Sequence, residues 1–221
     1  MFRMILPATL PDIATAESGT GEDARPVDAD AAAARTRADY GRVSRWALGL
    51  LGTVGALVAG ALVGFATSVI TSGLDPFGDA VFAGIILLIA AAFGVPSVWL
   101  LLGLHRSGRR LARAAGFWAG LPYRQGRRSP TRGDWFAVRF LGFSSDLFLR
   151  LITSALAGLA AIFTVTGVVR GIAIGQDAWE IVLWTCWSIV FIAVCIGQFG
   201  GVQRIQNGYL PRDPASLTRR G

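Results

Sequence analysis

The sequence has 221 residues, of which 53% are hydrophobic and only 16% are charged, and its formal net charge is +7. An average soluble domain has about 25% charged residues, so this composition excludes an ordinary soluble protein. With two cysteines and one histidine, the chain is not a disulfide-rich domain, and it holds no dense group of metal-binding or catalytic residue types.

The first part of the chain, residues 1–44, is rich in Ala, Asp, Thr, Pro and Gly and shows no sustained apolar face. A segment of this composition buries too little apolar surface to offset the entropy lost on ordering. We therefore predict a disordered cytoplasmic tail over residues 1–44, with a nascent helix where it leads into the first apolar segment.

Four long apolar segments follow, at residues 46–74, 80–104, 151–169 and 181–203, and none contains Asp, Glu or Arg. Because a helix rises 1.5 Å per residue, about 20 residues cross a hydrocarbon core about 30 Å thick. The apolar residues run continuously and do not alternate, which excludes a membrane β-barrel. The sequence predicts an all-α fold with transmembrane helices at 46–72, 79–104, 148–171 and 178–202.

These helices form two predicted hairpins, at residues 45–106 and 147–204, which pack as a four-helix transmembrane bundle. In lipid, small residues spaced four apart mark faces where helices approach closely. The predicted packing residues are Gly52, Ala56, Gly60, Gly64, Gly197 and Gly201. Packing within the chain is the default interpretation, and an oligomer or partner interface is the alternative. Pro96 removes a backbone donor inside the second helix and predicts a kink there.

The distribution of arginine predicts the orientation, because all 21 basic residues are arginine. Arginines are frequent before the first helix, between the second and third, and after the fourth, whereas the two short connections hold only Arg170. Since basic flanks stay in the cytoplasm, both termini, including the tail at 205–221, should be cytoplasmic. The Arg-only basic set and the heavy use of Ala and Gly are typical of GC-rich coding. We expect a multi-pass protein of a bacterial inner membrane.

The cytoplasmic connection at 107–146 interleaves arginines with aromatic residues. Residues 106–146 contain nine Arg and two Asp, a balance of +7. Aromatic rings among arginines next to a transmembrane helix are typical of an amphipathic segment lying in the headgroup layer. We expect it to bind anionic lipid headgroups or, as the sharper alternative, a cytoplasmic partner. The predicted contact residues are Arg109, Arg110, Arg113, Trp118, Arg127, Arg128 and Trp135. This role accounts for the positive charge, so no nucleic-acid partner is expected.

The predicted helix interiors hold no ionisable residue, which weighs against a proton-coupled pump. The sequence also lacks the motifs of P-loop NTPases, zinc proteases and serine hydrolases, so we expect no catalytic site, cofactor or metal. Two main hypotheses remain, ahead of a third, a membrane-embedded enzyme. The first is an accessory, structural or regulatory membrane subunit that packs with copies of itself or with a membrane-protein partner. The alternative is a small oligomeric transporter or channel for a small or uncharged solute, with a path lined by hydroxyls and Gln198.

Overall fold

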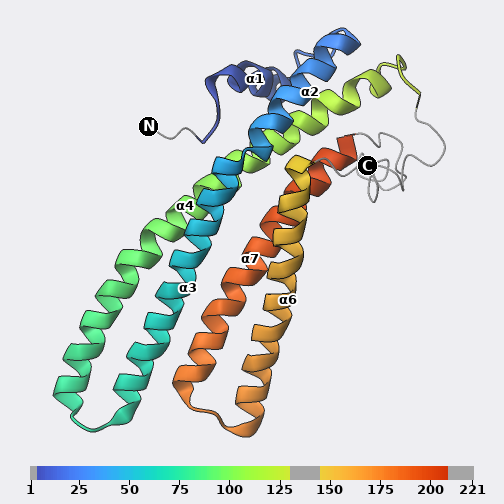
Figure 1. Ribbon diagram of the computed structural model, residues 1–221. Helices are drawn as coiled ribbons and strands as arrows, with labels where there is room; N and C mark the ends of the chain where they lie inside the picture. Colours follow the sequence, from blue (N-terminus) through green and yellow to red (C-terminus); the bar gives the residue numbers. More distant parts are fainter. Residues whose placement is uncertain (1–3, 130–144, 209–221) are drawn as a thin grey trace. The chain divides into compact units, whose positions relative to one another are not determined.

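A computed structural model describes residues 4–129 and 145–208 of the protein. Every regular element in these residues is a helix, as the predicted all-α class requires (Figure 1). In chain order they are η1 (Pro7–Thr9), α1 (Leu10–Ser18), α2 (Pro26–Gly41), α3 (Val43–Ser72), α4 (Pro76–Arg124), α6 (Ser145–Ile174) and α7 (Ala178–Gly208).

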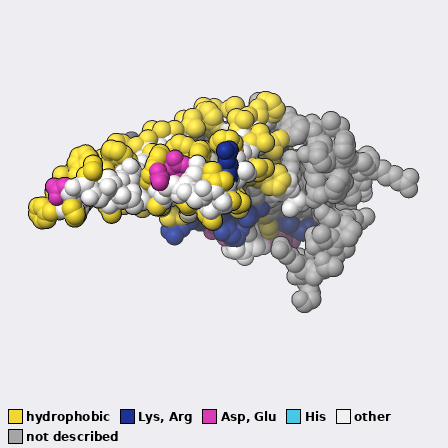
Figure 2. Space-filling view, turned by 90° about the horizontal axis from the view of Figure 1, so that it is seen from below, with side chains coloured by type: hydrophobic (Ala, Val, Ile, Leu, Met, Phe, Trp, Pro, Cys, Tyr) yellow, Lys and Arg dark blue, Asp and Glu magenta, His cyan; other side chains and the backbone are white. Residues whose placement is uncertain are grey.

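Four of these helices, α3, α4, α6 and α7, contain stretches that are long and apolar enough to cross a membrane, as predicted. Their apolar side chains remain exposed along these stretches, among them Leu88 and Trp99. Figure 2 shows hydrophobic side chains over much of the visible face, with few charged side chains between them. Because water would oppose so much exposed apolar surface, this surface fits a hydrocarbon environment.

Short turns join the long helices into the two predicted hairpins (Figure 1). Gly73 follows α3 with φ +65°, and Gly175 follows α6 with φ +69°. This left-handed backbone carries no Cβ penalty in glycine, and it is a common way to end a helix.

The chain divides into two compact units, each described by itself below. Unit 1 comprises residues 1–46, 104–151 and 198–221, and unit 2 comprises residues 47–103 and 152–197. The described part of unit 1 therefore contains η1, α1, α2, residues 104–124 of α4 and the ends of α3, α6 and α7. Unit 2 contains most of each apolar segment.

Unit 1 differs from the predicted disordered tail at 1–44. The described residues of this segment form η1, α1 and α2, and Ile13 and Ala29 are fully buried. The physical reason is that the segment packs against a helix that lies much later in the same chain. Judged alone, the segment has too little apolar surface to fold, but its small side chains bury themselves against α4, which continues to Arg124 and does not end at residue 104.

In unit 2, the glycine row of α3 contacts two different helices. A Cβ at Gly52 would lie 3.1 Å from Leu101 Cγ in α4, whereas a Cβ at Gly60 would lie 3.0 Å from Cys186 Cβ in α7. Gly64 meets α7 in the same way, with Leu183 Cβ at 3.2 Å. The absence of side chains at these positions thus lets α3 approach α4 near one end and α7 further along.

The other predicted packing and kink residues lie as follows. Ala56 and Gly197 are half-buried in α3 and α7. Gly201 belongs to unit 1, where a Cβ would overlap the hydroxyl of Tyr40. Pro96 lies within α4, whose helical assignment runs from Pro76 to Arg124 without a break, and the kink at this position stays a prediction.

Candidate functional site: the N-terminal helices on the α4 extension

The site is built on the α4 extension, which we define as residues 105–124, and on the N-terminal segment, residues 4–41. Leu111, Ala115 and Trp118 recur at helical spacing along one face of the extension and are buried. Two clusters cover this face. Ile13 of α1 belongs to the first and Ala29 of α2 to the second. Small alanines on both sides allow the helices to pack closely.

Trp118 lies inside this contact, with 5% of its surface exposed. Its indole Nε1 donates a hydrogen bond of 3.0 Å to the carbonyl oxygen of Asp12, which satisfies the one polar atom of the ring. Its ring also meets Phe117 edge to face, with centroids 5.2 Å apart. The prediction that Trp118 contacts lipid or a partner is therefore corrected, because α1 already occupies this side chain.

Two of the predicted lipid-binding arginines form ion pairs with the N-terminal segment. Arg110 donates through Nε and Nη2 to the two carboxylate oxygens of Glu17, both at 2.8 Å. Arg128 pairs in the same two-point manner with Asp30, at 3.2 and 2.8 Å. The hydrogen bond from Arg110 lowers the pKa of Glu17 below its ordinary value. Acidic residues of the chain itself thus occupy part of its basic surface.

Backbone carbonyls of the N-terminal segment add further contacts. Gln125 Nε2 donates to the carbonyl oxygens of Glu22 and Ala24, the latter at 3.1 Å, and Arg127 Nη1 donates to Ala24 at 3.4 Å. The connection between α1 and α2 is therefore held against the end of α4 by side chains that the sequence analysis assigned to lipid or left unassigned.

The remaining predicted contact residues have a different environment. Arg109 and Arg113 are exposed, and within the described residues neither forms an ion pair or a hydrogen bond. Trp135 lies outside the described residues. Some arginines of the predicted basic surface thus form ion pairs within the chain, whereas others face outward.

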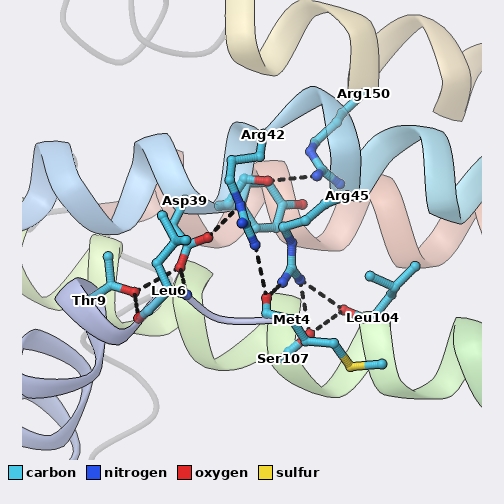
Figure 3. Close-up of polar contacts among 10 residues, drawn as sticks. Met4, Leu6, Thr9, Asp39, Arg42, Arg45, Leu104, Ser107 and Arg150 are labelled. Carbon is cyan, nitrogen blue, oxygen red and sulfur yellow. Dashed lines mark hydrogen bonds and ion pairs between the residues drawn. The ribbon is translucent and has the colours of Figure 1, made fainter. Parts of the chain in front are cut away.

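A buried polar network anchors the start of the N-terminal segment (Figure 3). Asp39, which is 1% exposed, accepts hydrogen bonds at Oδ2 from the backbone N–H of Leu6 at 2.8 Å and from the hydroxyl of Thr9 at 2.7 Å. Its other oxygen lies 2.8 Å from Arg42 Nε. This single carboxylate therefore ties three separate groups to the end of α2.

Arg45, which is 3% exposed, extends the network from α3 to α4. It donates to the carbonyl oxygen of Met4, to that of Leu104 at 3.3 Å, and to Ser107 Oγ at 3.0 Å. Carbonyl and hydroxyl oxygens thus replace the water that the buried Arg45 guanidinium has lost. The contact with Met4 also fixes the first described residue of the chain.

Arg150 of α6 joins α2 to α7 within unit 1. It donates to the carbonyl oxygen of Tyr40 at 2.6 Å and to Gln198 Oε1 at 2.9 Å, and its guanidinium carbon lies 4.3 Å from the centroid of the Tyr40 ring. Gln198, which the transport hypothesis placed on a solute path, therefore serves as an acceptor for a buried charge.

The sequence analysis missed this network, because each member resembles an ordinary charge at the end of a helix. One signal was present. Asp39 has Arg42 three residues and Arg45 six residues further on, which places one acid among bases at the boundary of an apolar segment. Such spacing predicts a local ion pair. It does not predict burial.

Unit 2 contains an apolar cavity of about 270 Å³. Its lining comes from α3, α6 and α7 and consists of Leu57, Ala160, Phe163, Thr164, Trp184, Trp187 and Phe191. The polar atoms of this lining bond elsewhere: Trp187 Nε1 donates to the carbonyl oxygen of Leu57 at 3.0 Å, and Thr164 Oγ1 donates to that of Ala160 at 2.9 Å. The cavity therefore suits an apolar occupant.

The described residues contain no group of three or more His, Cys, Asp or Glu side chains that could hold a metal ion. Both cysteines, Cys186 and Cys195, are free thiols. Comparison of the chain with models of protein families, with curated proteins and with solved structures finds no match.

Proposed function

We propose that the protein is an accessory, structural or regulatory subunit of a bacterial inner membrane, with both termini in the cytoplasm. The observation that carries the proposal is the folded state of the N-terminal segment. Its helices bury apolar side chains against the α4 extension, and the Asp39 and Arg45 contacts hold its first residues in place.

Ordering this segment presents a defined surface at the ends of the membrane helices. A flexible tail would offer the same charges in many arrangements, whereas ion pairs such as Arg110–Glu17 and Arg35–Asp12 hold them in one arrangement. Partners that recognise surface charge bind such a surface without the entropic cost of ordering it. This part of unit 1 therefore suits the docking of a partner protein that recognises surface charge.

The transport alternative receives less support from the same residues. It expects a polar cavity near Gln198, but the cavity in unit 2 is apolar and Gln198 accepts a hydrogen bond from Arg150. Gly60 and Gly64 contact α7 of the same chain, so these glycines favour packing within the chain over an interface with a partner or a second copy.

The proposal is tested by site-specific photo-crosslinking in the native membrane. A photoreactive residue replaces Val27, which is 76% exposed on α2. We expect a discrete crosslinked product with a second protein. The matched control replaces Leu121, which is buried under the N-terminal segment and should yield no intermolecular product. Solute flux through liposomes that contain only the purified chain would contradict the proposal and support transport.

A further inference from the structure

The outward-facing arginines of the α4 extension form a basic stripe, which we define as Arg106, Arg109 and Arg113. At 100° per residue they lie within about 60° of one another around the helix. All three are exposed, and none forms an ion pair or a hydrogen bond in the part of the chain that the structure describes. Arg110, beside them, is occupied by Glu17.

A second helix adds positive charge next to this stripe. Arg109 of α4 and Arg204 of α7 both act electrostatically on His105, so the two guanidinium groups belong to one neighbourhood in unit 1. The carboxylates of Asp12, Glu17 and Asp30 each pair with an arginine outside the stripe. Glu17 also attracts Arg113 electrostatically, but its ion pair is with Arg110, so the stripe keeps most of its positive charge after the fold has formed.

The stripe follows the apolar segment directly in the sequence. That segment ends at Leu104, and Arg106, Arg109 and Arg113 come 2, 5 and 9 residues after it in the same continuous helix. Basic residues that follow a membrane-spanning segment this closely are expected at its headgroup layer. Side chains of a helix lean toward its N-terminus, which for α4 is the direction of the apolar segment. The guanidinium groups thus lean back toward the headgroups.

We propose that the basic stripe binds the phosphate groups of anionic phospholipids at the membrane surface that α4 leaves. The inference rests on the proposed membrane location and deepens the lipid interaction predicted from the sequence. It also changes the mode of binding. Trp118 and Leu111 are buried under the N-terminal segment and cannot insert into the bilayer, so among the described residues of this segment the contact depends on charge.

The test measures which lipids remain on the purified protein. The chain is reconstituted in nanodiscs with equal amounts of phosphatidylglycerol and phosphatidylcholine, and the retained lipids are identified by native mass spectrometry. The stripe variant carries R106Q, R109Q and R113Q. The control variant carries R25Q, R35Q and R128Q, which removes the same charge from arginines that pair with Asp28, Asp12 and Asp30.

We expect the wild-type protein and the control variant to retain phosphatidylglycerol in preference to phosphatidylcholine. Each basic residue near an anionic surface contributes roughly a factor of five to binding, so the stripe variant should lose the preference by on the order of 100-fold. High salt should weaken the preference of the wild-type protein, because exposed charges are screened.

Three results would overturn the inference: an unchanged preference in the stripe variant, an equal loss in both variants, or displacement of the lipid by inorganic phosphate beyond that caused by chloride at equal ionic strength. The last result would indicate a site for a soluble anion. Because the purified chain is measured alone, any of these results leaves the crosslinking test of the subunit proposal unaffected.

Discussion

The buried carboxylate of Asp39 contacts three separate groups in unit 1. A buried carboxylate is stable only when donors or counter-charges surround it. Here the Leu6 N–H and the Thr9 hydroxyl donate to Asp39, and the Arg42 guanidinium forms an ion pair with it. The Arg25–Asp28 pair of the same helix has the same spacing of three residues but is exposed. The two pairs have the same spacing in the sequence and differ in how deeply they are buried.

We expect Asp39→Asn to release the N-terminal segment, because Arg42 loses its counter-charge in a partly buried site. The cost should be about 3 kcal/mol, the lower end of the cost of breaking a buried ion pair, because the Arg42 side chain is 22% exposed. Hydrogen exchange would measure this cost: the amides of residues 4–18 should exchange faster, and those of other stretches should not. Asp28→Asn is the control and should leave the exchange of this stretch unchanged, because its pair with Arg25 is exposed to solvent. Equal exchange in the two variants would contradict the assigned role of Asp39.

Glu17 predicts a pH dependence of the contact between α1 and α4. The hydrogen bond from Arg110 lowers the pKa of Glu17 below 4.5, so the pair stabilises the fold above pH 4.5 and this stabilisation is lost as the pH falls through the lowered pKa. Both side chains are about half exposed, so screening keeps the effect below about 1 kcal/mol. Glu17→Gln should therefore lower the melting temperature slightly near neutral pH and leave it unchanged well below pH 4.5.

The control for Glu17 is Glu22→Gln, because the Glu22 side chain forms no ion pair within the described residues. We expect its melting temperature to follow that of the wild-type protein at every pH. If Glu17→Gln and the wild-type protein differ equally at neutral and acidic pH, the Arg110 pair is not the cause of the difference.

At the scale of elements, close approach of helices depends on small residues in both units. In unit 1 the alanines of α2 meet Ala119 and Trp118 of α4, and in unit 2 the glycines of α3 meet α4 and α7. In lipid there is little hydrophobic gain in bringing two helices together, so the contacts of unit 2 depend on dispersion and shape. A bulky side chain at such a position should separate the helices.

We predict that Gly60→Leu destabilises unit 2 by about 1–3 kcal/mol, because the added side chain meets Cys186 Cβ, which rotation cannot move. Thermal unfolding in detergent would show a lower melting temperature. Gly84→Leu is the matched control: a Cβ at Gly84 meets nothing within 4 Å, so the melting temperature should be unchanged or higher. Equal melting temperatures for both variants would show that α3 and α7 do not pack at Gly60.

At the scale of the whole molecule, four helices are long and apolar enough to cross a membrane, and the arginines gather before α3, after the apolar part of α4 and after α7. This distribution predicts that both ends of the chain lie on one side of the membrane. The two short turns, after α3 and after α6, then lie on the other side. The orientation follows from charge, since the hydrophobic effect is the same in either direction.

Labelling of single cysteines tests this topology. Cys186→Ala and Cys195→Ala give a cysteine-free background that keeps the Cβ facing Gly60. In intact cells, a membrane-impermeant maleimide should label Leu74→Cys in the first turn and should leave Ser129→Cys after α4 unlabelled until the membrane is opened. Labelling of position 129 in intact cells would reverse the predicted orientation.

The sequence by itself determined the four apolar helices, because crossing a bilayer requires about 20 consecutive apolar residues and this is a local property. It also identified Arg110, Arg128 and Trp118 as residues that bind something. Only the tertiary structure decided what they bind. Glu17 lies 93 residues before Arg110, and no local pattern connects them. The composition of the N-terminal segment predicts disorder because it takes no account of the α4 surface. The segment folds because it and α4 together remove apolar area from water.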